Sequence, residues 1–199
     1  MEDNINKATT KSCKKDISII AITPNLKDTS KSIESYLKEL KRHQIDAVVF
    51  RNKAIASKKF IKLFNNFHEE FSNSFSVNLF ANCSEETFND IKDLADGIHL
   101  TAERLMNLKA KKFNKIYGAS CHNKKEIIKA SNSKLDYCFL GPVQKNIYKK
   151  KYIGWDKFNN ISSFSEIKVY ALGGLSIENL KVAKKNNAAG IASISSFNN

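Results

Sequence analysis

The chain has 199 residues, of which 42% are hydrophobic, and a formal net charge of +13. This length suits one domain with a full core, and a content of 13 Phe argues against a disordered protein. No apolar run approaches the roughly 18 residues of a membrane span. The polar start MEDNINKATTKSCKKD also lacks the apolar centre of a signal peptide. We therefore expect a cytoplasmic protein with no membrane partner.

The positive charge does not by itself identify a partner, because nucleic acids and anionic substrates both attract cations. Of the 33 basic residues, only Arg42, Arg51 and Arg104 are arginine, and the lysines are spread along the chain. No aromatic and basic residues are interleaved in a stacking motif, so we expect no nucleic-acid partner. The four cysteines form no C-x-x-C pair, which argues against a zinc site or a disulfide framework.

Short β-branched or aromatic segments alternate with amphipathic segments along the chain. We predict strands at 18–23, 47–52, 76–82, 97–101, 115–121, 137–143, 169–175 and 190–196. We predict helices between them at 32–44, 57–71, 87–94, 102–108, 124–133, 155–164 and 176–187. In the last helix, Ser176 is a suitable N-cap, and Asn179 follows at the third helical position.

Eight strands that alternate with seven helices predict a (β/α)₈ TIM barrel at residues 17–199, after a polar segment at 1–16. The alternative is an open doubly wound sheet, but no G-x-G-x-x-G follows the first strand. Because the sequence stops just after the eighth strand, we expect a barrel that lacks the final helix. We expect a homodimer, the N-terminal segment or both to cover the apolar face left open on that strand.

The chemistry of such barrels lies at the C-terminal ends of the strands. Gly173 and Gly174 end the seventh strand, and Ile194 and Ser195 end the eighth. Glycines expose backbone amides to an anion, and a serine adds a hydroxyl donor. We predict a phosphate site at these two strand ends. The alternative is a tight turn in which small residues only permit close packing.

Six segments occur in the order and spacing of one family: AVVFRNKA, ADGIHLT, GASCHN, DYCFLGPV, YALGGLSIENL and AGIASISSF. Over residues 17–197 the chain resembles the thiamine phosphate synthase and thiazole tautomerase family. It looks closest to a barrel domain that some bacteria fuse to a Nudix hydrolase. The resemblance implies a barrel that couples hydroxymethylpyrimidine diphosphate with thiazole phosphate, with Mg²⁺ on the diphosphate. It also implies phosphorylated thiamine precursors as partners, and it suggests a functional link to a Nudix hydrolase.

The resemblance assigns roles to residues after the second and fifth strands. Arg51 and Lys53 match the basic residues of the family's Q-L-R-x-K motif, where cations stabilise the charge of a leaving diphosphate. Ser120 matches a serine that contacts the pyrimidine. His122 lies two residues later and is a candidate acid–base group, with a structural histidine as the alternative.

Two further segments match substrate-binding motifs of the family. Asn82 takes the position of a substrate-binding asparagine after the third strand. After the sixth strand, the family's T-x-T-K diphosphate loop is replaced by a lysine-rich stretch. In it, Asn146 stands at a Thr position and Lys149 keeps the Lys position. A solvated basic loop is the alternative to a cationic lid.

The magnesium positions depart from the family pattern. Cys83 stands where the family has an aspartate, and Arg104 stands where a second acidic ligand is expected. A thiol and a guanidinium do not replace the hard oxygen ligands of Mg²⁺. Glu85 and Glu103 are the acidic residues close enough in sequence to substitute for them.

The sequence therefore predicts a transferase of thiamine biosynthesis with a degenerate magnesium site and a slow or lost coupling activity. One alternative is a metal-independent tautomerase or salvage enzyme acting on thiazole phosphate, although the tautomerase's characteristic histidine falls on Pro142. The other alternative is a non-catalytic module that binds thiamine phosphates.

Overall fold

The computed structural model describes residues 17–53, 55–145 and 151–198. Eight parallel strands pair in chain order and close into a barrel through β8 and β1. The strands are β1 (Ile19–Ile22), β2 (Ala47–Phe50), β3 (Asn78–Ala81), β4 (Gly97–Leu100), β5 (Ile116–Cys121), β6 (Tyr137–Leu140), β7 (Lys168–Leu172) and β8 (Gly190–Ser193). The predicted TIM barrel is confirmed.

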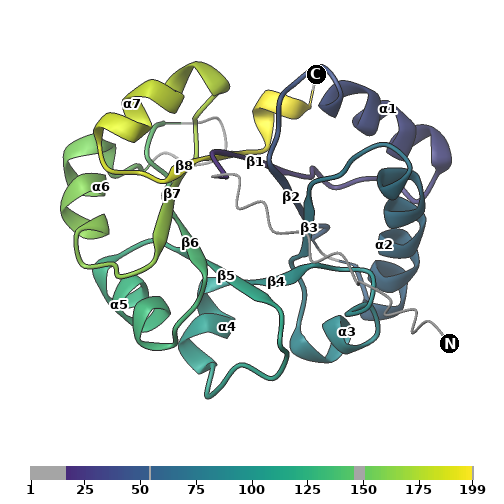
Figure 1. Cartoon of the computed structure of the whole chain (residues 1–199), viewed down its shortest axis with the longest axis horizontal. Coiled ribbons are helices and arrows are strands. Elements are labelled where there is room, and N and C mark those ends of the chain that lie inside the picture. The colour runs from purple at the N-terminus through teal and green to yellow at the C-terminus, as the bar shows by residue number, and fades with distance from the viewer. Residues whose placement is uncertain (1–16, 54, 146–150, 199) are drawn as a thin grey trace, which may run out of the picture.

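Helices form an outer ring around the strands (Figure 1). They are α1 (Ser30–Leu40), α2 (Ser57–Ser72), α3 (Glu85–Asn89), α4 (Ala102–Asn107), α5 (Lys124–Asn132), α6 (Gly154–Ser162) and α7 (Leu180–Lys185). A short 3₁₀ turn, η1 (Ile177–Asn179), leads into α7. Its capping box joins Ser176 and Asn179, as expected from the sequence. No helix among the described residues has the length and apolar character needed to cross a membrane.

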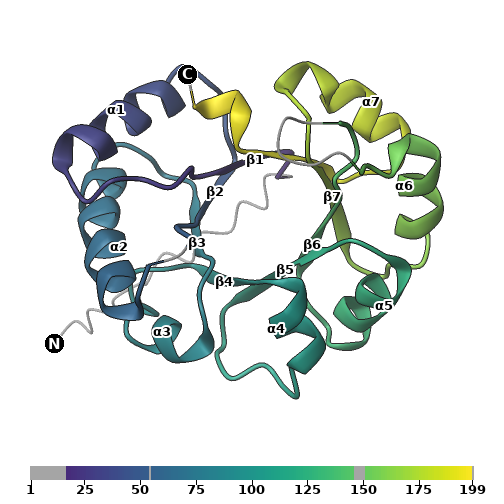
Figure 2. The ribbon, with the colours of Figure 1, turned by 180° about the vertical axis from the view of Figure 1, so that it is seen from behind.

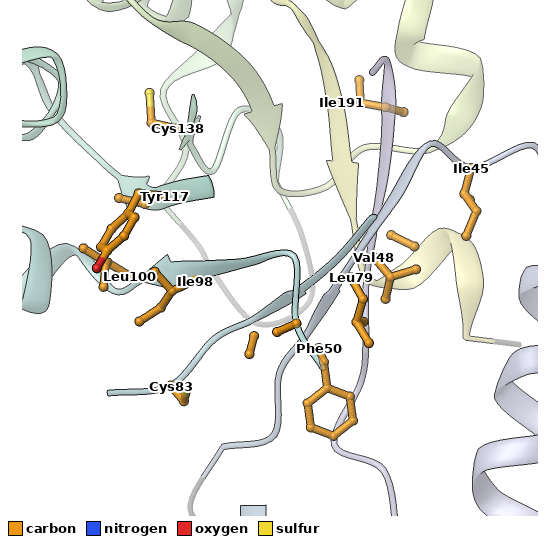
Figure 3. Packing of buried hydrophobic residues seen from close by; sticks show 14 of the residues in the cluster. Ile45, Val48, Phe50, Leu79, Cys83, Ile98, Leu100, Tyr117, Cys138 and Ile191 are labelled. Carbon is orange, nitrogen blue, oxygen red and sulfur yellow. The ribbon is translucent and has the colours of Figure 1, made fainter. Parts of the chain in front are cut away.

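Side chains along each strand alternate between the barrel centre and the surrounding helices. Nine buried residues fill the centre: Ile20, Ile22, Ala47, Val49, Phe80, Tyr137, Phe139, Tyr170 and Ala192. The residues between them pack outward in a second layer, of which Figure 3 shows Val48, Leu79 and Ile98. Because the barrel interior is packed, a ligand has access only to the strand ends.

Three aspartates join neighbouring strands at the end of the barrel where the strands begin. Each directly precedes an even-numbered strand, and its carboxylate accepts a backbone N–H at the start of the odd-numbered strand before it. The contacts are Asp46 Oδ2 with the Ile19 amide (3.0 Å), Asp96 Oδ2 with the Leu79 amide (2.8 Å) and Asp136 Oδ2 with the Tyr117 amide (2.8 Å). Ala189 takes the same place before β8. The carboxylates thus accept hydrogen bonds from backbone amides at the strand starts, which the strand pairing does not satisfy.

The chain after β8 forms a 3₁₀ turn, η2 (Ser195–Phe197), and the described residues contain no α-helix beyond it. Phe197 is fully buried, and its ring lies edge-on to His43 with the centroids 5.3 Å apart. Figures 1 and 2 both show η2 between α7 and α1, where an eighth helix would lie. All four residues of β8 are buried within the chain. The burial of β8 therefore gives the homodimer no support, and the homodimer stays a prediction. The predicted cover by the N-terminal segment at 1–16 lies outside the described residues.

The predicted strands extend past their observed ends by up to three residues. Arg51, Asn82 and Gly141, for example, lie just after β2, β3 and β6 rather than within them. These residues follow the last strand pairings, where the chain turns outward to the helices. This difference puts Arg51 and Asn82 in loops at the C-terminal end of the barrel.

Candidate active site

Polar side chains from three strand ends are half-buried at the C-terminal end of the barrel, which we call its mouth. Arg51 follows β2, Asn82 follows β3, and Ser120 is the next-to-last residue of β5. The backbone N–H of Asn82 donates to the Phe50 carbonyl at 2.8 Å, and this bond holds the loop after β3 against β2. The structure therefore places these three predicted residues at the same end of the barrel, as the sequence indicated.

Arg51 is fixed through its backbone by a buried threonine of the neighbouring loop. The Arg51 amide donates to Thr23 Oγ1 at 2.8 Å, and the Thr23 hydroxyl donates to the Arg51 carbonyl at 2.8 Å. Burial lowers the pKa of the Arg51 guanidinium from its ordinary value. Among the described residues, no carboxylate lies within ion-pair distance of Arg51. Arg51 is thus a partly desolvated cation that a bound anion would neutralise.

Lys53 lies on the same loop and is more exposed. Its backbone amide donates to Asn25 Oδ1 at 2.9 Å, and the neighbouring Asn52 side chain donates to the Leu26 carbonyl at 2.8 Å. These two bonds tie the loop after β2 to the loop after β1. Lys53 is therefore an exposed residue of a tied loop, two positions after Arg51.

A hydrogen-bonded row of three side chains crosses the barrel interior below the mouth. His99 of β4 lies between Ser120 and Tyr137, with Nε2 at 2.9 Å from Ser120 Oγ and Nδ1 at 3.1 Å from the Tyr137 hydroxyl. Burial lowers the pKa of His99 to about 3, so the ring is neutral at ordinary pH. His99 and Tyr137 were not predicted as site residues from the sequence. The alternation in GIHL, with Ile98 and Leu100 facing outward, was the signal that His99 faces inward.

His122 takes a different position from Ser120 although both belong to the GASCHN segment. Its Nδ1 lies 3.1 Å from Glu126 Oε2, and its amide donates to the same oxygen at 2.6 Å. Asn123 caps α5 and bonds to Glu126 as well. His122 also lines an open cleft of about 430 Å³ with Pro142, Lys151, Tyr152 and Lys157. The ring is thus engaged in the helix start, which favours the structural reading over an acid–base role.

The two glycines after β7 have a structural requirement of their own. Both have positive φ, +97° at Gly173 and +70° at Gly174. A Cβ on Gly173 would lie 2.5 Å from the Pro142 Cβ, and one on Gly174 would lie 2.8 Å from the Gln144 and Lys145 carbonyl oxygens. Close packing against the loop after β6 therefore explains the glycine pair without a ligand.

The backbone amides at the ends of β7 and β8 are nevertheless available to an anion. Within the described part of the chain, no backbone carbonyl accepts from the amides of Gly174, Ile194 or Ser195. Ser193 holds the end of β8 in place, since its hydroxyl donates to the Leu175 carbonyl at 2.8 Å. Three donors at two adjacent strand ends remain compatible with the predicted phosphate site.

Cys83 and Arg104, the residues predicted at the family's magnesium positions, lie near each other. Cys83 is buried in the outer apolar layer (Figure 3), and burial raises the pKa of its thiol to about 12, an effect that the nearby Arg104 guanidinium partly offsets. Glu85 is engaged by the Tyr117 hydroxyl at 3.3 Å and Lys112 at 3.3 Å, while Glu103 is exposed on α4. A neutral buried thiol beside a cation is not a donor set for Mg²⁺. The described residues also contain no cluster of three His, Cys, Asp or Glu side chains suited to a metal ion.

Asn146 and Lys149 lie outside the described residues, so their part in the site stays a prediction. The neighbouring segment that is described begins again at Lys151. There the Ile153 amide donates to the Pro142 carbonyl at 2.9 Å, and the Gly154 amide donates to the Val143 carbonyl at 2.9 Å. These bonds anchor the far end of the lysine-rich stretch beside the mouth.

A sequence model of the family described as thiamine monophosphate synthase matches residues 19–197. This match covers nearly the whole barrel. The chain belongs to the thiamine monophosphate synthase family. The six segments singled out in the sequence all fall in the matched range, and the predicted family is confirmed at this level.

Members of the thiamine monophosphate synthase family are similar to this chain in sequence and in fold. A thiamine-phosphate synthase of Streptococcus suis is 35% identical over 109 residues, which make up 52% of this chain and 48% of the relative. One from Methanosarcina mazei is 34% identical over 107 residues, or 51% and 45% of the two chains. The chain thus spans about half the length of the curated relatives it matches. The structure of a thiamine phosphate pyrophosphorylase from Pyrococcus furiosus superposes with a TM-score of 0.70 at 21% identity, covering 90% of this chain and 86% of the other.

Proposed function

We propose that this protein couples hydroxymethylpyrimidine diphosphate with thiazole phosphate in thiamine biosynthesis. In that reaction the C–O bond to the diphosphate breaks, the diphosphate leaves with the electron pair, and the thiazole nitrogen bonds to the freed methylene carbon. The observation that carries the proposal is Arg51, a half-buried cation at the barrel mouth with no carboxylate partner among the described residues. A leaving diphosphate supplies the anion that such a cation lacks.

Each substrate has a candidate position at the mouth. Arg51 and Lys53 would hold the diphosphate, with Lys149 as a further cation from the lysine-rich stretch. Ser120 and Asn82 would face the pyrimidine, with Asn146 as a further substrate contact. The amides of Gly174, Ile194 and Ser195 would bind the phosphate of the thiazole, with Gly173 permitting the turn. His122 would act at most from the edge of the site, since its ring is engaged by Glu126.

The donors at positions 83 and 104 do not suit Mg²⁺, so we derive no step through a metal ion. Fixed cations act on the same leaving charge, and we propose that they do so here with a slow turnover. The unsuitable donors at positions 83 and 104 also favour a second candidate without coupling chemistry. It is either a metal-independent tautomerase or salvage enzyme acting on thiazole phosphate, or a non-catalytic module that binds thiamine phosphates. A homodimer and a functional link to a Nudix hydrolase stay predictions.

The test is the formation of thiamine phosphate from both precursors, with and without Mg²⁺. We expect coupling in the unaltered protein and a loss of about 100-fold or more in kcat/KM for Arg51→Ala. Arg42→Ala is the matched control, because Arg42 is exposed and paired with Glu39 on α1, and it should change the rate less than twofold.

Three results would each contradict one part of the proposal. Equal rates in Arg51→Ala and the unaltered protein would show that the diphosphate binds elsewhere. No product from the unaltered protein, together with measurable binding of thiazole phosphate by calorimetry, would favour the second candidate. Fast coupling that depends strongly on Mg²⁺ would instead show that the metal binds through groups such as Glu103.

A further inference from the structure

We propose that Tyr137 fixes the tautomer of His99, and that His99 in turn leaves the Ser120 hydroxyl free to donate its hydrogen bond to a ligand. Tyr137 and His99 are then positioning residues, and Ser120 is the residue that contacts the ligand. The ligand atom opposite Ser120 would be a hydrogen-bond acceptor with a lone pair, such as a nitrogen of an aromatic ring. This last step rests on the proposed function, whereas the tautomer itself does not.

The neutral His99 ring has one N–H and one lone pair, so its two hydrogen bonds have opposite directions. In one arrangement Tyr137 donates to Nδ1, and the Nε2–H donates to Ser120. In the other, Ser120 donates to Nε2, and the Nδ1–H donates to Tyr137. The distances of 2.9 Å and 3.1 Å suit both arrangements.

The surroundings of Tyr137 decide between the two arrangements. Its side chain is buried in an aromatic setting, with ring centroids 5.4 Å from Phe80, 5.4 Å from Phe139 and 5.9 Å from Tyr170. Among the described residues, the Tyr137 hydroxyl has His99 Nδ1 as its hydrogen-bond partner and no other. If Tyr137 accepted from Nδ1–H, its own hydrogen would be buried without an acceptor, which is the costly case for a buried polar group.

Ser120 lies in a different environment. It is half-buried at the end of β5, where water or a ligand can reach the hydroxyl. Its hydrogen can therefore be donated outward, whereas that of Tyr137 can only be donated to His99. The arrangement in which Tyr137 donates satisfies all three groups. It follows that Nε2 of His99 carries the hydrogen and that Ser120 accepts from it.

The tautomer can be read directly from long-range ¹H–¹⁵N correlation spectra of the ligand-free protein labelled at histidine. The signals of buried His99 should not shift between pH 8 and 5.5, because burial keeps its ring neutral. We expect the hydrogen of His99 on Nε2. A hydrogen on Nδ1 would overturn the proposal, because Ser120 would then be the donor to the ring.

Two variants separate the roles of the neighbours. In Ser120→Ala, Tyr137 still donates to Nδ1, so the Nε2–H tautomer should persist. In Tyr137→Phe, the group that selects the tautomer is gone, and both forms should be populated. A Tyr137→Phe spectrum identical to that of the unaltered protein would show that something other than Tyr137 selects the tautomer, and the proposal would fail.

The ligand step is tested by binding of the hydroxymethylpyrimidine and of an analogue in which C–H replaces a ring nitrogen. We expect the unaltered protein to prefer the pyrimidine about tenfold or more and Ser120→Ala to lose that preference. Equal preference in both proteins would refute the Ser120 contact. Failure of the proposed function would appear differently, as an absence of pyrimidine binding with the Nε2–H tautomer unchanged.

Discussion

Replacing Phe197 by Ala tests whether the 3₁₀ turn after β8 takes the place of an eighth helix. The Phe197 side chain is fully buried in the outer apolar layer, so the change removes a complete core ring. Such truncations cost about 3–5 kcal/mol, a large share of the roughly 5–15 kcal/mol that stabilises a domain. With a urea slope of about 2–3 kcal/mol per molar, the unfolding midpoint should fall by about 1–2.5 M.

Phe164→Ala is the matched control, because Phe164 is 40% exposed and contacts Lys124 through a cation–π interaction. It should cost about 1 kcal/mol or less. Unfolding should be measured by circular dichroism at two protein concentrations. If Phe197→Ala costs no more than the control, η2 does not stabilise the barrel in the way an eighth helix would. A midpoint that rises with protein concentration would instead support the predicted homodimer.

Three further predictions concern the frame of the site. Asp136→Ala leaves the Tyr117 amide without its acceptor and should lower the free energy of unfolding by about 1–3 kcal/mol in urea titration, and an unchanged midpoint would contradict the bridging role. Gly174→Ala should lower the free energy of unfolding more than Gly154→Ala. Both glycines have φ near +70°, but nothing lies within 4 Å of a Cβ on Gly154, whereas one on Gly174 would meet backbone oxygens. Equal losses of stability in urea titration would mean that φ alone sets the cost. Because burial raises the pKa of Cys83 to about 12, the thiol should stay uncharged and resist iodoacetamide at pH 8 until urea unfolds the protein. Peptide mass spectrometry would refute this if it found Cys83 alkylated in the folded protein.

Much of the fold follows from local sequence patterns. The alternation of β-branched segments with amphipathic ones predicted eight strands and seven helices, and the order of the elements predicted closure. The capping box at Ser176 and Asn179 was also foreseeable, since both partners lie within one turn. Likewise, Arg51, Asn82 and Ser120 were identified because each follows or ends a strand, and parallel strands bring those ends together.

Other features depend on contacts between residues far apart in the chain. The glycine pair after β7 suggested an anion site, yet its closest neighbours are backbone and Pro142 atoms of the loop after β6. The 3₁₀ turn η2 packs against β1 and α1, which lie more than 150 residues earlier in the chain.

The row formed by Tyr137, His99 and Ser120 depends partly on local sequence and partly on contacts between distant residues. The pattern of β4 indicated that His99 faces inward, but its partners come from β5 and β6, and their register was not readable from the sequence. The sequence by itself determined which residues reach the barrel interior, because side chains alternate along a strand. Only the tertiary structure decided which of them meet, because strand register and burial set each distance and make the neutral ring of His99 the more stable form.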